Sequence, residues 1–423
     1  MKWLFVISTF PLLAQTPTVK LTIEEAREMA LNNHPAIAAL RYGAEAADQL
    51  PLQVRAALAP QVSSGTVASA ANPDGRLAFQ GLNSPLLISR AATGVQLSQL
   101  LTDFGRTSLL AESASLRAAG QRERVRASRL EILTAVDRAF YSVLRARQIL
   151  RVAEETLKAR QTVVDQVEAL AGSQLRSSLD VSFSKVNLAD ARLLVVQARN
   201  QFEASEAELT LALGLRDQPN FDLADRPLNE VLPNDPEQLV REAIATRPEL
   251  KQLELELQSL DAELRSQKLQ SKPTVSAVGA LGVVPLAQGN RPVYYSAAGV
   301  SITLPILNGK LFAAQQTETS LRIRAVEKNK QERLNRLARD VRTAYLNART
   351  AFERLTVTND LLTQAKLSLD LAQTRYDLGL STIVELSTAQ LNLTSAEVAA
   401  TSSRYEYQIL RSALKYQLGE NPL

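Results

Sequence analysis

The sequence predicts a mainly α-helical protein with a small β part, in which one structural unit occurs twice. Three observations support this fold class. The second half of the 423-residue chain repeats the first, two long runs nearly lack helix breakers, and short alternating segments precede each run. Each unit is therefore expected to combine a long antiparallel coiled-coil helical hairpin with a β-hairpin.

The repeat appears as matching residues at a nearly constant offset. Pro35 matches Pro248 at an offset of 213 positions, whereas Val95 matches Val300 at an offset of 205. The length difference falls between about residues 70 and 91, where turn-forming residues gather, so we expect an exposed loop there. We assign residues 15–214 to the first structural repeat, 215–235 to a linker and 236–423 to the second repeat.

The first residues have the pattern of an export signal. Lys2 provides a positive start, the run from Trp3 to Leu13 is mostly apolar, and Ala14 is a small residue suited to cleavage. We expect residues 1–14 to form a signal peptide. Their apolar run is too short to span a bilayer as a helix, and no later segment has 18 consecutive apolar residues.

Alternating apolar and polar residues predict four strands, two in each repeat. From Val95 to Leu100 nearly every second residue is apolar, and Val300 to Leu304 repeats this pattern in phase. The predicted strands cover about residues 61–70, 91–101, 274–283 and 294–304. Four strands close a barrel poorly, whereas strands from several chains together can close one.

The long helices are predicted from runs that lack breakers. The run from Arg106 through Ala171 contains only Gly120, and the run from Lys310 through Leu378 contains neither glycine nor proline. A seam of apolar residues with interspersed alanines favours a close-packed coiled coil. We predict long helices over about residues 106–171, 178–213, 310–378 and 382–418, paired as hairpins that turn at Gly172 and Gly379.

Two shorter helices are expected beside the linker. Residues 22–33 and 236–246 have helical composition, and the linker between the repeats is rich in Asp and Pro. We expect the linker and these helices to form an equatorial belt around the middle of the long helices.

Composition excludes several kinds of site. The chain has no cysteine, which excludes disulfides, thiolate metal sites and a lipidated cysteine. Its one histidine, His34, precedes Pro35 at a helix break and is expected in a turn, because a metal site or general base would need partners nearby. The net charge of +4 is spread along the chain, which argues against a nucleic-acid partner. We predict no enzyme activity, no catalytic residues, no metal and no cofactor, because Ser, Asp and Glu lack a convergent arrangement.

The two junctions between a returning strand and a long helix carry a family resemblance. One reads Gln99-Leu100-Leu101-Thr102-Asp103-Phe104-Gly105 and the other Leu304-Pro305-Ile306-Leu307-Asn308-Gly309. With the repeated order of elements around them, the chain resembles the TolC-type outer-membrane efflux protein family, also called outer membrane factors. The resemblance implies a homotrimer that forms a 12-stranded β-barrel in the Gram-negative outer membrane, continued by an α-helical periplasmic tunnel.

The resemblance also implies a periplasmic gate at the hairpin tips. Asp180 and Tyr376 match gate positions, and Glu385 matches a position in an acidic ring. The basic gate partner is replaced by Ser381 and a second acidic position by Thr388.

Because that basic partner is absent, we expect Arg176 to take part in the lock. The tips are also expected to contact a periplasmic adaptor. The residues expected there are Leu378, Gly379, Leu380, Ser381, Thr382, Leu175, Ser177 and Ser178.

Three function classes remain to be compared. The favoured one is a passive outer-membrane channel-tunnel of a tripartite efflux or type I secretion system. Its partners would be a periplasmic adaptor (membrane fusion) protein, an inner-membrane pump and outer-membrane lipid. The alternative is a periplasmic coiled-coil adaptor or structural protein of an export system. An adaptor would carry one helical hairpin with β-rich domains, so the duplication argues against this alternative. The third class is an enzyme.

Overall fold

A computed structural model describes residues 19–69, 90–217, 221–225, 235–284 and 293–419. The predicted signal peptide lies outside these ranges, as does most of the interval from 70 to 91 that contains the length difference. The described part is mainly helical with a small β part, which confirms the predicted fold class.

The chain forms two compact units. Unit 1 comprises Met1–Ala39, Arg126–Arg247 and Leu334–Leu423, and unit 2 comprises Leu40–Val125 and Pro248–Arg333. The units do not coincide with the two sequence repeats, because each unit takes segments from both. Unit 2 contains the main sheet, and unit 1 contains the ends of both helical hairpins.

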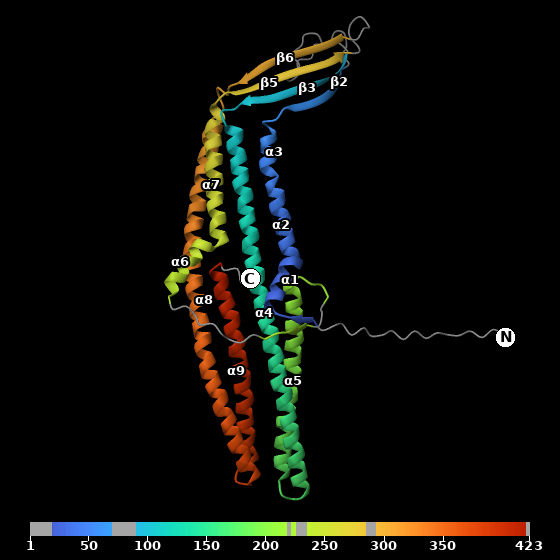
Figure 1. Cartoon of the computed structure of the whole chain (residues 1–423), viewed down its shortest axis with the longest axis vertical. Helices are drawn as coiled ribbons and strands as arrows, with labels where there is room; N and C mark the ends of the chain where they lie inside the picture. Colours follow the sequence, from blue (N-terminus) through green and yellow to red (C-terminus); the bar gives the residue numbers. More distant parts are fainter. Residues whose placement is uncertain (1–18, 70–89, 218–220, 226–234, 285–292, 420–423) are drawn as a thin grey trace, which may run out of the picture. The chain divides into compact units, whose positions relative to one another are not determined.

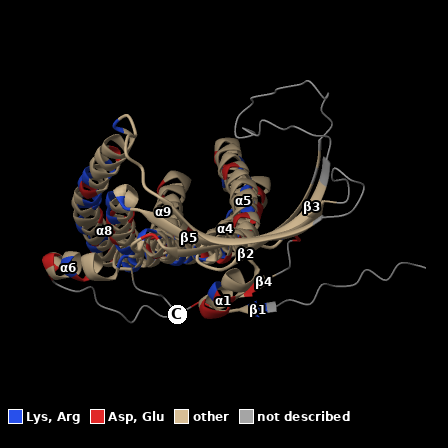
Figure 2. Ribbon diagram, turned by 90° about the horizontal axis from the view of Figure 1, so that it is seen from above, with Lys and Arg blue, Asp and Glu red and all other residues tan. Residues whose placement is uncertain are grey.

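The main sheet has four antiparallel strands in the order β2-β3-β5-β6 (Figure 1). Their bounds lie within one residue of the predicted ranges: β2 Gln61–Ser69, β3 Arg90–Thr102, β5 Thr274–Val284 and β6 Val293–Thr303. A bulge shifts the register between Leu100 and Thr102. Figure 2 shows that β2 and β5 carry no charged residue.

The two faces of this sheet differ in chemistry. Successive side chains of a strand point to opposite faces, so the register assigns each residue to one of them. One face carries most of the large exposed apolar side chains among a few serines and threonines, and these apolar residues include Val62, Val95, Leu97, Leu281, Val300 and Ile302. The other face carries mostly small and polar residues, including Ser63, Gln96, Ser98, Ser276 and Ser301, together with a few apolar ones such as Val278.

Short helices and parts of the long ones complete unit 2. Helix α3, Leu50–Ala56, has a proline in its first turn, and α7, Pro248–Lys268, ends in a single 3-10 turn, Leu269–Ser271. Helix α2, Pro35–Asp48, leads into this unit. Helices α4 and α7 pack closely, as shown by the buried hydroxyls of Ser113 and Ser259, which lie 3.0 Å apart.

The four long helices differ from the predicted ranges by at most one residue at either end. Helix α4, Arg106–Gly172, and α5, Ser178–Ala212, form the first hairpin, and α8, Leu311–Asp377, and α9, Ile383–Gln417, form the second (Figure 1). No helix in the described ranges combines the length and the apolar character needed to cross a membrane.

The core of unit 1 contains the seam that the sequence indicated. Val136, Phe140 and Leu144 of α4 are buried with Leu209 and Leu213 at the end of α5. Their spacing of four residues places all three α4 side chains on one helix face. Val341 and Tyr345 of α8, which match Val136 and Phe140 in the second repeat, are also buried.

The linker contains a short strand that the sequence did not reveal. Strand β4, Phe221–Leu223, pairs in parallel with β1, Val19–Leu21. Two three-residue strands are too short for an alternating pattern to be read from sequence. Asp225 then accepts hydrogen bonds from Arg404 (2.8 Å) and from the Tyr405 hydroxyl (3.0 Å), which attach the linker to α9.

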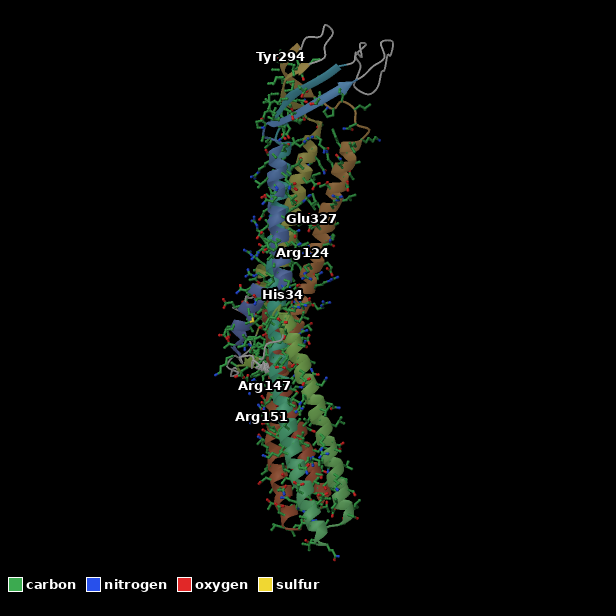
Figure 3. All side chains as sticks on the ribbon, turned by 90° about the vertical axis from the view of Figure 1, so that its right-hand side faces the viewer. His34, Arg124, Arg147, Arg151, Tyr294 and Glu327 are labelled. Carbon is green, nitrogen blue, oxygen red and sulfur yellow. The ribbon has the colours of Figure 1, made fainter. Side chains whose placement is uncertain are left out.

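The two short helices of unit 1 lie within one residue of their predicted bounds. Thr22 and Glu25 form a capping box at the start of α1, Ile23–Asn33, and Asp235 caps α6, Pro236–Thr246. His34, labelled in Figure 3, follows α1. Its backbone is extended, and its Nδ1 accepts a hydrogen bond from the Ala36 backbone N–H.

One buried ion pair fixes α1 against α4. Nε and Nη2 of Arg27 donate to the two carboxylate oxygens of Asp137 at 2.7 and 2.8 Å. Both residues are buried, with 8% and 2% of their surface exposed. Burial lowers the pKa of the Arg27 guanidinium, but the hydrogen bonds and charge of Asp137 raise it above its usual value. The bidentate geometry keeps the Arg27 guanidinium charged.

The first junction between strand and long helix is held by a carboxylate. Asp103 accepts hydrogen bonds from the backbone N–H groups of Gly105 (3.1 Å) and Thr107 (2.8 Å) and from the Thr107 hydroxyl. These bonds satisfy N–H groups that the first turn of α4 would otherwise leave without partners.

Candidate functional site at the helical tips

The turn between α8 and α9 forms around a glycine in left-handed conformation. Gly379 has φ of +73°, its N–H donates to the Tyr376 carbonyl at 3.0 Å, and Leu380 N–H donates to the Arg375 carbonyl at 2.8 Å. This pair of bonds satisfies carbonyls at the end of α8. Thr382 then caps α9, because its hydroxyl accepts a hydrogen bond from the Glu385 N–H.

The turn between α4 and α5 places a different residue in that conformation. Gln174, with φ of +62°, occupies the position equivalent to Gly379, and Leu175 N–H donates to the Leu170 carbonyl at 2.9 Å. The predicted turn residue, Gly172, is instead the last residue of α4. The prediction was wrong because glycine is the usual left-handed residue, whereas here a glutamine bears the strain.

Replacing Gln174 with glycine is expected to stabilise the first tip by about 1 kcal/mol, because glycine adopts positive φ without a steric penalty. Thermal unfolding and hydrogen exchange of the tip amides would measure the gain. The reverse change, Gly379→Gln, serves as a matched control and is expected to cost a similar amount at the second tip. If Gln174→Gly lowers the stability, the strain assigned to Gln174 is wrong.

Tyr376 lies at the centre of the candidate site. The residue is 4% exposed, and it packs in a cluster with Val163, Val167, Ile383 and Leu386. Its hydroxyl is buried and has no hydrogen-bond partner among the described residues. Burial raises the pKa of the phenol, and the nearby charge of Arg176 only partly opposes this shift. The ring therefore stays neutral.

Arg176 of the first tip stacks on this ring. Its guanidinium carbon lies 4.4 Å from the centroid of the Tyr376 ring, which is within the range of a cation–π interaction. The structure thus brings together Arg176 and Tyr376, which the sequence had placed in one gate. It joins the first hairpin to the second through the ring face and not through the hydroxyl.

The two acidic residues of the expected gate already have partners within the chain. The carboxylate of Asp180 accepts a hydrogen bond from the Ser177 N–H at 3.1 Å, in a capping box at the start of α5. Glu385 forms an ion pair with Arg375, with 3.3 Å between Nε and Oε1. Sequence reasoning missed Arg375, although its position just before Tyr376 was the available signal.

The positions that depart from the family pattern make local contacts. The Ser381 hydroxyl is buried and has no hydrogen-bond partner among the described residues. The Thr388 hydroxyl donates to the Val384 carbonyl at 2.8 Å. Thr388, Arg375 and Glu385 line the same open cavity of about 610 Å³ between α8 and α9.

The residues expected to contact an adaptor are almost all exposed. Ser381 is half-buried, whereas Ser177, Ser178, Gly379 and Thr382 are exposed. Among the leucines, Leu175 is 71%, Leu378 68% and Leu380 67% exposed. Exposed leucines at both tips form apolar surface of the kind that marks protein contacts.

Comparison with protein families matches residues 26–215 and 239–420 to the model described as outer membrane efflux protein. A curated relative, the probable efflux pump outer membrane protein TtgC of Pseudomonas putida, is 25% identical over 311 residues. That alignment covers 71% of this chain and 63% of the relative, so the chain spans less than two thirds of the relative's length.

Solved structures have the same fold at low sequence identity. A membrane protein from Pseudomonas aeruginosa is 21% identical with a TM-score of 0.79, covering 94% of this chain and 93% of that one. The CmeC outer membrane channel of Campylobacter jejuni is 14% identical with a TM-score of 0.80, covering 99% of this chain and 94% of that one.

Proposed function

Because the chain belongs to the outer membrane efflux protein family, we propose that it is the passive outer-membrane duct of a tripartite efflux or type I secretion system. Three copies would close one barrel in the outer membrane of a Gram-negative cell and one tunnel in the periplasm. A periplasmic adaptor would dock at the helical tips, and an inner-membrane pump would supply the energy.

The observation that best supports this proposal is the unequal chemistry of the sheet. One face exposes large apolar side chains such as Val62 (67%) and Ile302 (69%), and the other carries serines and glutamine. A strand that separates lipid from an aqueous lumen requires this division. The exposed leucines of the tips provide a separate surface for a partner in the periplasm.

The gate of this duct would be held through Arg176 and Tyr376. Their contact joins the tips of both hairpins of one copy, so a movement of the hairpins apart must break it. A cation–π contact is worth about 0.5–2 kcal/mol, depending on how much water is excluded. The pair of Arg375 and Glu385 would leave less free negative charge at the entrance than an unpaired acidic ring.

Replacing Arg176 with glutamine is expected to raise the conductance of the purified protein in planar lipid bilayers. Loss of the contact changes the ratio of open to closed states by about 2- to 30-fold for each copy, converted from the cation–π energy. Tyr376→Phe keeps the ring face and should conduct like the wild type.

Arg151→Gln is the matched control. Arg151 (Figure 3) lies on α4, away from the tip, and forms an exposed ion pair with Glu155. Unchanged conductance of Arg176→Gln would exclude this contact as the lock. A wild-type protein that is a water-soluble monomer without conductance would overturn the duct itself.

A further inference from the structure

A row of three glycines and one tyrosine crosses the sheet. Gly65 pairs with Gly94, Gly94 pairs with Gly282, and Gly282 pairs with Tyr295, so the row takes one residue from each strand. All four residues lie on the face that carries the small and polar side chains. Tyr295 is the largest side chain on that face among the described strand residues.

The tyrosine ring lies flat across two of these glycines. A Cβ atom on Gly282 would lie 2.5 Å from the Tyr295 hydroxyl and 2.6 Å from Cζ, and one on Gly94 would lie 2.5 Å from the same hydroxyl. These distances leave no room for any side chain under the ring. By contrast, a Cβ on Gly65 would meet nothing within 4 Å. The ring therefore reaches over β5 to β3 and stops before β2.

The neighbouring tyrosine has the opposite orientation. Tyr294 (Figure 3) pairs with Val283 on the apolar face and is 81% exposed, whereas Tyr295 is 41% exposed. Two adjacent tyrosines thus belong to two different environments, and only Tyr295 has a seat of glycines beneath its ring. Aromatic residues that cover glycines across strands are a known stabilising arrangement in sheets.

We propose that the seat formed by Gly94 and Gly282 keeps the passage wide, because it lets the Tyr295 ring lie flat against the wall. This inference rests on the proposed function, in which the small and polar face lines the lumen. Each copy in the closed barrel would contribute one such ring. A side chain in the seat would lift the ring toward the lumen and narrow the passage for bulky solutes.

Single-channel conductance of four variants, each compared with the wild type, tests this proposal. Gly94→Ala is expected to lower the conductance, because its methyl group would occupy the place of the Tyr295 hydroxyl. Tyr295→Ala is expected to change the conductance less than Gly94→Ala does, because a flat ring obstructs little. The double variant should conduct like Tyr295→Ala, since no ring remains to be lifted. Gly65→Ala is the matched control in the same row and should conduct like the wild type.

The double variant also separates the ring from the backbone. A Cβ on Gly94 would lie 2.7 Å from the Leu281 carbonyl, so Gly94→Ala strains the pairing of β3 with β5 as well. If the double variant conducts as poorly as Gly94→Ala, the strain and not the ring narrows the passage, and the proposal is wrong. It is equally wrong if Tyr295→Ala alone widens the passage strongly, because the ring would then already project.

A second pair of variants avoids any change in the glycines. Tyr295→Trp is expected to lower the conductance, because an indole is larger than the space over Gly94 and Gly282. Tyr294→Trp on the apolar face should leave the conductance unchanged. Equal conductance of both variants would contradict the proposal. A wild-type protein that does not conduct would instead refute the proposed function, so the two failures are distinguishable.

Discussion

Replacing Asp137 with alanine is expected to destabilise the folded protein by about 3–5 kcal/mol, because the Arg27 guanidinium would stay buried after losing its carboxylate. Arg27 donates two short hydrogen bonds to Asp137, and both side chains are almost completely buried. The midpoint of denaturant unfolding, followed by circular dichroism, measures the loss. The first helix, α1, should also become accessible to protease, since this pair connects it to α4.

Two controls test whether the loss of stability comes from leaving a charge buried without its partner. Glu155→Ala removes an exposed partner of Arg151 on the same helix and should cost about 0.2–1 kcal/mol at most. The double replacement Arg27→Met with Asp137→Leu should recover most of the stability, because a buried pair can be replaced by apolar side chains of similar size. A loss for Asp137→Ala as small as that for Glu155→Ala would show that water reaches the pair.

Replacing Tyr376 with alanine is expected to cost about 3–5 kcal/mol in the stability of the helical tips, the usual cost of deleting a buried aromatic ring. The ring packs against α4 and α9 side chains and supports Arg176, so its loss removes packing and the cation–π contact together. Hydrogen exchange of amides near Val167 and Leu386 measures the local effect, which a global unfolding signal would underestimate.

Tyr376→Phe is the informative comparison. The buried hydroxyl has no hydrogen-bond partner among the described residues, and such a group costs about 1–3 kcal/mol. Phenylalanine keeps the ring and removes the hydroxyl, so this variant should be as stable as the wild type or more stable. A strong loss of stability would mean that the hydroxyl has a partner in the assembled protein.

The sequence predicted the long helices and strands well for identifiable physical reasons. Breaker-free runs of good helix formers leave few alternatives to helix, and the spacing of Val136, Phe140 and Leu144 places these residues on one face. The repeat supplied a second copy of each signal. The strand ranges followed from alternation around Val95 and Val300 in the same way.

The tips were harder to predict because their contacts depend on how distant segments meet. Gln174 takes a backbone conformation that sequence reasoning assigns to glycine, so the turn was placed at Gly172. Arg375 and Glu385 form an ion pair across a turn between two helices. The sequence contains many charged residues near the tips, so this pairing could not be predicted from it. Arg176 and Tyr376 were identified only through a resemblance, which did not reveal that the ring face makes the contact.

The pairing of β3 with β5 makes the sheet depend on both repeats of the chain. Residues such as Thr93 and Val283 become neighbours only after the whole first hairpin and the linker have been made. Without β5, strands β2 and β3 would be a two-stranded ribbon with an open edge, and such ribbons are marginally stable on their own. Contacts between such distant segments also form slowly. The sheet is therefore completed only after residues of the second repeat have been made, a condition that two independently folding repeats would not impose.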